Sequence, residues 1–204
     1  MPVRGLVFDL YGTLVTRGEG WRAYRELIYK TLPPWAWRRA RRAALTQPIP
    51  TLAAFREHFE ARWGPPPEHF DRLLAEGLAA VDLVEGCVAT LERARERGLK
   101  LALLSNLAAP YKRPVFELGL DRHFDVLVFS CDVGMAKPEP AIFEHAAARL
   151  GLGLDELIMI GDSRHDDVRG AREAGMRALH VDPRGRGDIR RLAELLDHPL
   201  LLEG

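Results

Sequence analysis

The sequence predicts an α/β fold, in which a parallel β-sheet is flanked by helices and an all-helical segment is inserted after the first strand. Two observations lead to this prediction. Five short apolar runs alternate with helical patterns along most of the chain, and such alternation gives a parallel sheet with helices on both faces. Between residues 16 and 84 the alternation stops, and only helical patterns occur.

The five apolar runs have the features of buried strands. Each is too short for a helix, and each is followed directly by Asp, Ser or Gly. The predicted strands are Leu6–Phe8, Leu101–Leu104, Val126–Phe129, Leu157–Ile160 and Ala178–Val181.

Helical patterns separate these strands, and four of them stop at a glycine, which commonly follows the last residue of a helix. These four helices are predicted over Gly86–Arg97, Tyr111–Leu118, Pro140–Leu150 and Asp167–Ala174. A fifth amphipathic helix is predicted over Asp188–Leu196, followed by a loose tail.

The inserted segment predicts a second unit. Its helical patterns are broken by proline-rich stretches and cover Trp21–Thr31, Trp35–Leu45, Thr51–Trp63 and Glu68–Val81. We therefore expect a core made of residues 1–15 and 85–204 and a helical cap made of residues 16–84. The second of these helices carries Arg38, Arg39, Arg41 and Arg42, which spread around its circumference. They form either a solvated face or, for one or two of them, an anion contact.

Composition narrows the class of protein. The chain has 204 residues, 47% of them hydrophobic, and a formal net charge of zero, so no basic excess points to nucleic acid or an anionic membrane. No apolar run approaches the roughly 18 residues that would span a bilayer. A strand begins within a few residues of Met1, which predicts the absence of a signal peptide. We expect a cytoplasmic protein, monomeric or homodimeric, that acts on a small anionic molecule.

Polar residues follow four of the predicted strands. Since ligands of open α/β sheets bind outside the carboxyl ends of the strands, these residues should share one crevice. Clustered carboxylates repel one another unless a cation intervenes, and Mg²⁺ prefers carboxylate and phosphate oxygens. The cluster therefore predicts an Mg²⁺ cofactor. Its members are Asp9 with Thr13, Ser105 with Asn106, Lys137, and Asp162 with Asp166 and Asp167.

The same residues suit group transfer. The carboxylate of Asp9 can act as a nucleophile that forms a covalent intermediate. Thr13, Ser105 and Asn106 offer donors for a transferring anionic group. Taken singly, each element has a structural explanation, such as a helix N-cap at Ser105 or a surface position for Lys137. Their joint occurrence after successive strands favours the chemical interpretation.

These motifs resemble those of the haloacid dehalogenase superfamily of aspartate-nucleophile hydrolases over nearly the whole chain. Residues 8–14 resemble its first motif, 104–106 its second, 137–140 its third and 161–171 its fourth. The resemblance implies a Rossmann-like core with a helical cap inserted after the first motif. It implies Asp9 as nucleophile, Ser105 and Lys137 as anchors of the transferred group, and Asp162 as a metal ligand. Asp167 would ligate or support the metal.

One position departs from the phosphatase pattern. Phosphatases of this family usually carry a second aspartate two residues after the nucleophile, which protonates the leaving alcohol and then activates water. Here that residue is Tyr11. Its backbone carbonyl could still bind a metal, so the predicted metal ligands are Asp9, Tyr11 and Asp162. Without a general acid, rates typically fall by roughly 10²–10⁴-fold.

Tyr11 is similar instead to the 2-haloacid dehalogenase branch, in which halide leaves without a proton. Trp37-Arg38 also resembles the place where that branch supplies an arginine for the substrate. The predicted substrate-binding residues are accordingly Tyr11, Gly12 and Arg38. Other positions differ, because that branch needs no metal and tends to have uncharged residues where this chain has Asp162 and Arg164.

Three functions follow from this mixture. The first is Mg²⁺-dependent hydrolysis of a small phosphorylated metabolite, favoured by the second carboxylate at Asp162. The second is metal-independent dehalogenation of a 2-haloacid, favoured by Tyr11. The third is binding of a phosphorylated ligand with weak catalysis or none, favoured by the missing general acid.

Overall fold

The computed structural model describes residues 2–17, 33–47 and 70–202. Its centre is a five-stranded, fully parallel sheet with the strand order β3-β2-β1-β4-β5. The strands are β1 (Gly5–Phe8), β2 (Lys100–Ser105), β3 (Val126–Phe129), β4 (Leu157–Gly161) and β5 (Arg177–His180). The predicted α/β class and all five predicted strands are confirmed.

β1 lies in the middle of the sheet and is buried on both faces. It pairs with β2 on one side and with β4 on the other, and all four of its residues are buried. Leu6 and Phe8 belong to one hydrophobic core cluster, and Val7 belongs to a second on the opposite face. This arrangement explains why β1 has a continuous apolar sequence rather than an alternating one.

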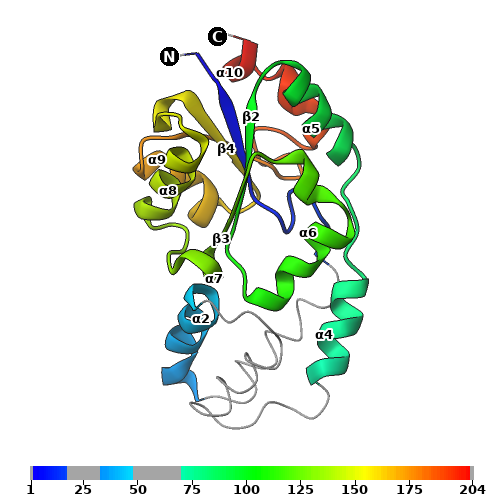
Figure 1. Cartoon of the computed structure of the whole chain (residues 1–204), viewed down its shortest axis with the longest axis vertical. Helices are drawn as coiled ribbons and strands as arrows, with labels where there is room; N and C mark the ends of the chain where they lie inside the picture. The colour runs from blue at the N-terminus through cyan, green and yellow to red at the C-terminus, as the bar shows by residue number, and fades with distance from the viewer. Residues whose placement is uncertain (1, 18–32, 48–69, 203–204) are drawn as a thin grey trace.

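Helices cover both faces of the sheet (Figure 1). The first core cluster includes residues of α5 (Cys87–Glu96) and α6 (Arg113–Glu117), and the second includes residues of α8 (Pro140–Leu150) and α9 (Gly170–Glu173). The bounds of α8 are those predicted. A short helix that the sequence pattern did not predict, α7 (Ser130–Val133), follows β3.

Outside the inserted segment, three predicted helices differ in the structure. The helix expected over Tyr111–Leu118 is divided into a 3-10 turn over Ala109–Lys112 and α6. The helix expected over Asp167–Ala174 is divided into a π-helical turn over Arg164–Arg169 and the short α9. The prediction of a helix over Asp188–Leu196 is wrong, because the structure has only a 3-10 segment over Leu192–Asp197 in this region. The reason is tertiary: the backbone amide of His180 donates to Asp188 Oδ2 at 2.7 Å, and Val181 pairs with Ile189 as a β-bridge.

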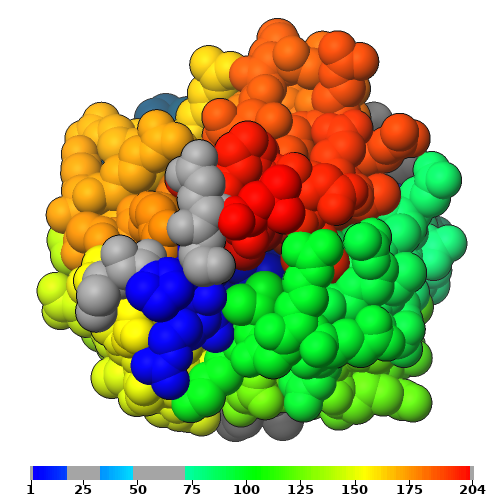
Figure 2. Space-filling view, turned by 90° about the horizontal axis from the view of Figure 1, so that it is seen from above, coloured from blue at the N-terminus to red at the C-terminus, as the bar shows by residue number. Residues whose placement is uncertain are grey.

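The residues after Leu196 were predicted to form a loose tail, but those described, up to Leu202, include a packed helix. The terminal helix α10 (Pro199–Leu202) packs through Leu200 and Leu201 against the first core cluster. Figure 2 shows α10 beside the N-terminal residues, at the end of the molecule away from α2 and α4 in Figure 1.

The inserted segment contributes α2 (Trp37–Thr46) and α4 (Phe70–Ala79) to the described residues. They match the helices predicted over Trp35–Leu45 and Glu68–Val81, although Pro34–Ala36 forms a 3-10 turn. The helices predicted over Trp21–Thr31 and Thr51–Trp63 lie outside the described residues. α2 packs near α7, and an ion pair joins Arg42 of α2 to Glu139 of the core.

No helix within the described ranges is long and apolar enough to cross a lipid bilayer.

Candidate active site

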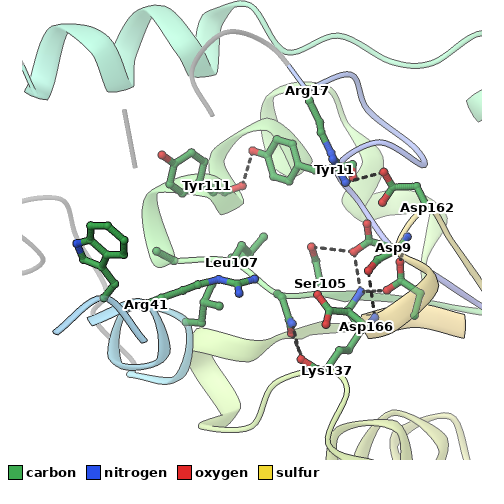
Figure 3. Close-up of a pocket in the computed structure, with 16 residues that line it drawn as sticks. Asp9, Tyr11, Arg17, Arg41, Ser105, Leu107, Tyr111, Lys137, Asp162 and Asp166 are labelled. Carbon is green, nitrogen blue, oxygen red and sulfur yellow. Dashed lines mark hydrogen bonds and ion pairs between the residues drawn. The ribbon is translucent and has the colours of Figure 1, made fainter. Parts of the chain in front are cut away.

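The carboxyl ends of β1, β2 and β4 meet at a cavity of about 750 Å³. Asp9 follows β1, Ser105 ends β2, and Asp162 follows β4, so three neighbouring strands each deliver one polar side chain (Figure 3). Lys137 enters from the loop after α7 and also lines the cavity. Residues far apart in the sequence are therefore brought together by sheet topology, as the strand pattern predicted.

Asp9 is buried and held in one orientation. Its side-chain atom Oδ1 accepts hydrogen bonds from Lys137 Nζ at 2.7 Å and from Ser105 Oγ at 3.3 Å. The backbone amide of Asp9 donates to the carbonyl of Ile160 at 2.9 Å, which continues the pairing with β4. Burial raises the pKa of Asp9 to about 6, although Lys137 acts in the opposite direction. The carboxylate is thus fixed, poorly solvated and available for attack at neutral pH.

Lys137 connects two buried carboxylates. Its Nζ atom lies 2.7 Å from Asp9 Oδ1 and 2.6 Å from Asp167 Oδ1, and it also donates to the carbonyl of Leu104 at 2.9 Å. Burial lowers the pKa of Lys137, but Asp167 and Asp9 outweigh this effect and hold the pKa above its ordinary value. The ammonium therefore stays charged and can neutralise an anionic group at Asp9.

Asn106 positions Lys137 through the backbone. The Asn106 side chain donates to the carbonyl of Lys137 at 2.8 Å and accepts from its amide at 2.9 Å. Both functional groups of the Asn106 amide are used in this reciprocal pair. This pair fixes Asn106 relative to Lys137, while the predicted catalytic role of Asn106 stays a prediction.

Asp9, Asp162 and Asp167 form an acidic cluster that fits a divalent cation. Each offers a carboxylate oxygen, and these three atoms lie within 4.8 Å of one another. Burial raises the pKa of Asp162, and Asp167 adds repulsion, while Arg17 acts against both. Oxygen-only ligands and an excess of negative charge are the chemistry that Mg²⁺ requires, so the residues present fit this ion.

The comparison with known protein families decides the classification. A model described as haloacid dehalogenase-like hydrolase matches residues 3–175. The chain belongs to this hydrolase family.

Relatives of this haloacid dehalogenase-like hydrolase include phosphatases. It is 40% identical over 133 residues to a phosphoserine phosphatase of Thermus thermophilus, covering 63% of this chain and 53% of the relative. It is 30% identical to a phosphoglycolate phosphatase of Pectobacterium atrosepticum, covering 87% and 79%. The chain spans about half the length of the first of these. A solved phosphatase structure from Thermococcus onnurineus has a TM-score of 0.70 at 26% identity, covering 96% and 97%.

Most of the predicted site residues of this hydrolase line the cavity, and three do not. Those that line it are Asp9, Tyr11, Ser105, Asn106, Lys137, Asp162 and Asp167. Thr13 is buried outside the cavity lining, and its hydroxyl has no hydrogen-bond partner among the described residues. Gly12 lies in the turn after β1, next to the Asp162 carboxylate, and does not line the cavity. Arg38 is exposed and does not line the cavity.

Arg41, rather than the predicted Arg38, lines the cavity. Trp37, Arg41 and Leu45 follow one another at intervals of four residues along α2, and all three line the cavity. That spacing places them on one helix face, whereas Arg38 borders this face and is exposed. The helical period starting from Trp37 was the signal that could have identified Arg41. Arg17 and Tyr111 also line the cavity and were missed, because no motif marks them.

The Tyr11 side chain is held against Tyr111 at the cavity wall. Its hydroxyl donates to the carbonyl of Tyr111 at 2.9 Å, and the two rings make an edge contact with centroids 6.2 Å apart. In Figure 3 the ring points toward Tyr111 and away from Asp9. Burial raises the pKa of Tyr11 well above its ordinary value. The side chain forms part of the cavity wall.

We expect Tyr11→Phe to leave kcat within about threefold of wild type and to lower the unfolding free energy by about 0.5–1.5 kcal/mol, the contribution of one hydrogen bond. The substitution removes the hydroxyl that donates to the Tyr111 carbonyl and keeps the ring. Steady-state kinetics and urea denaturation measure the two effects. A fall in kcat of more than tenfold with unchanged stability would instead identify Tyr11 as the proton donor.

Proposed function

We propose that this protein is a Mg²⁺-dependent phosphatase of a small phosphorylated metabolite that uses Asp9 as its nucleophile. The contact between Lys137 and Asp9 carries the proposal, because it sets a charged donor directly against a buried carboxylate at the edge of a cavity. The phosphatase relatives support the choice of substrate class.

The proposed chemistry has two steps. The Asp9 carboxylate attacks phosphorus, the bond from phosphorus to the leaving oxygen breaks, and an aspartyl-phosphate forms. Water then attacks the same phosphorus, phosphate departs and the carboxylate is restored. Lys137 and Ser105 stabilise negative charge on the transferring group. A cation at Asp9, Asp162 and Asp167 would supply further charge neutralisation when bound.

The absence of a second aspartate at Tyr11 limits the kind of leaving group that we propose. A second aspartate would protonate a leaving alkoxide, and the Tyr11 hydroxyl is engaged with Tyr111. His165 is exposed, pairs with Asp166 and does not line the cavity. We therefore favour substrates whose leaving group departs without a proton, such as acyl phosphates.

The inserted segment has a proposed role in substrate selection. We propose that residues 16–84 form a cap on a core made of residues 1–15 and 85–204. α2 contributes Trp37, Arg41 and Leu45 to the cavity, while the residues around the reacting group come from the core. A division of this kind would let α2 select the substrate without touching the nucleophile.

A substrate panel measured with Mg²⁺ and with EDTA tests the proposal. We expect acetyl phosphate and p-nitrophenyl phosphate to be hydrolysed with Mg²⁺, to be turned over much faster than alkyl phosphates, and to be inert in EDTA. Asp162→Asn should lower the rate with Mg²⁺ toward the EDTA level. Absence of turnover of every phosphorylated compound with Mg²⁺ would refute the proposal.

Dehalogenation of a 2-haloacid is the second candidate, favoured by Tyr11 in place of the second aspartate. Solvent oxygen distinguishes the two reactions. An ester of Asp9 would be hydrolysed at the carboxyl carbon, which brings ¹⁸O from labelled water into Asp9, whereas an aspartyl-phosphate hydrolysed at phosphorus leaves Asp9 unlabelled. We expect mass spectrometry of the peptide containing Asp9 to show no label after phosphate turnover. Halide release from chloro-acids in EDTA, with labelled Asp9, would support dehalogenation.

A further inference from the structure

Arg17 binds two oxygens at the edge of the acidic cluster. Its Nη2 atom lies 2.5 Å from Asp162 Oδ2, and its Nε donates to the backbone carbonyl of Tyr11 at 3.3 Å. Figure 3 shows the side chain reaching down from the segment after β1 to Asp162. One guanidinium thus bridges the turn after β1 and the end of β4.

Asp162 and Asp9 belong to the acidic cluster that would hold a cation, and the Tyr11 carbonyl is a further ligand that the sequence predicts. A guanidinium that donates to Asp162 and to the Tyr11 carbonyl occupies one lone pair on each oxygen, so that fewer remain for a metal. It also places a positive charge where a second one would be repelled. Arg17 and a divalent cation therefore compete for these groups, because Arg17 already engages Asp162 Oδ2 and the two positive charges repel each other.

The turn at Gly12 brings the competing groups together. Gly12 has a φ of +89°, a conformation that favours glycine, and a Cβ at this position would collide with the Asp162 carboxylate. The same Cβ would lie 3.0 Å from Arg17 Nε. The backbone of Gly12 thus packs directly under the Arg17–Asp162 pair and leaves no room for a side chain between them.

The exposure of the pair is asymmetric. The side chain of Asp162 is 19% exposed, whereas that of Arg17 is 47% exposed. Asp162 directly follows β4, while the Arg17 side chain is the more solvent-exposed member of the pair.

We propose that Arg17 is an internal competitor of the divalent cation, which neutralises Asp162 in the metal-free protein and is displaced when the metal binds. The inference rests on the proposed function, since it takes the acidic cluster as the cation site. Coupling of this kind is reciprocal: the metal weakens the Arg17 contacts by the factor by which Arg17 weakens metal binding. Arg17 would thus set the Mg²⁺ concentration at which the site fills.

Arg17→Gln tests the competition through metal affinity. We expect the variant to bind Mg²⁺ about fivefold more tightly than wild type, the upper range for one partly exposed ion pair. Isothermal titration calorimetry measures the Mg²⁺ affinity, and electron paramagnetic resonance of free Mn²⁺ provides a second determination. Neither readout depends on turnover.

Arg164→Gln is the matched control. Arg164 lines a neighbouring cavity together with Arg17 and Asp162, but its guanidinium donates to the carbonyl of Arg186. The control removes the same charge near the site without removing a contact to Asp162. We expect less than a twofold change in Mg²⁺ affinity.

Thermal unfolding separates competition from a purely structural role of Arg17. In EDTA, Arg17→Gln should unfold at a lower temperature than wild type, because Asp162 loses its counter-ion. With saturating Mg²⁺ the gap should close, because the metal takes over that role. A structural role would lower the unfolding temperature equally in both conditions and would overturn the inference.

The measured Mg²⁺ affinities also show whether the competition alone fails or the proposed function fails. Equal Mg²⁺ affinity of Arg17→Gln and wild type would overturn the competition and leave the phosphatase proposal standing. An equal gain in Arg164→Gln would show a long-range charge effect and would likewise overturn the competition. Absence of Mg²⁺ binding by wild type and variant would overturn the cation site itself, and the competition with it.

Discussion

Asp9→Asn is expected to lower phosphate turnover on the order of 10⁴-fold or more, the scale of losing a catalytic nucleophile. The amide keeps the shape of the carboxylate but cannot attack phosphorus. Asp166→Asn is the control, because Asp166 lines the same cavity but pairs with His165 rather than with Lys137. It should retain activity within about tenfold. Steady-state assays with acetyl phosphate measure both, and substantial activity in Asp9→Asn would exclude Asp9 as nucleophile.

The loss of activity should not be a loss of folding. Burial raises the pKa of Asp9 to about 6 in the metal-free protein, so folding disfavours the ionised carboxylate. A group with a raised pKa makes the folded state less stable as pH rises toward that value, and Asn lacks this titration. We therefore expect Asp9→Asn to be more stable than wild type at pH 7 in EDTA. The difference should shrink as pH falls from about 6 toward 4, which denaturation at several pH values would show.

Lys137→Met is expected to lower the unfolding free energy by about 3–5 kcal/mol, the cost of leaving buried charge without its partner. Asp9 and Asp167 both face Lys137 Nζ within 2.7 Å, and all three residues are buried. Turnover should fall as well, because the transferring group loses its positive contact. Chemical denaturation in EDTA measures the change in stability.

A double substitution and a surface control identify the cause. Adding Asp167→Asn to Lys137→Met removes one of the uncompensated carboxylates, so the pair should be more stable than Lys137→Met alone. Lys112→Met breaks the more exposed ion pair with Asp132 and should cost at most about 1 kcal/mol. A Lys137→Met protein as stable as the Lys112→Met control would contradict the buried network.

The sheet was predictable because its strands are defined by local sequence. Each is a short apolar run closed by a polar or glycine residue, and burial on both faces leaves no other environment for it. The helix predicted over Asp188–Leu196 failed for the opposite reason. There, the side chain of Asp188 and the backbone of Ile189 bind the end of β5, and these contacts reach back beyond the four-residue range of a helix.

The candidate site was predictable where its residues sit at strand ends, but not where side-chain packing decides their direction. Asp9, Ser105 and Asp162 sit at strand ends, where position follows from topology, so their convergence could be expected. The direction of the Tyr11 side chain and the reach of Arg17 depend on packing around residues distant in sequence, such as Tyr111 and Asp162. Neither follows from a motif.

The reciprocal hydrogen bonds between the Asn106 side chain and the Lys137 backbone have a consequence for how the substrate preference of this protein could evolve. They join the loops after β2 and α7 as one rigid frame, so the groups that hold the reacting centre keep their spacing whatever surrounds them. Trp37, Arg41 and Leu45 lie on a separate helix, outside the Asn106–Lys137 pair. New substrate preferences could therefore evolve by substitution on α2 alone, while the reaction itself is inherited unchanged.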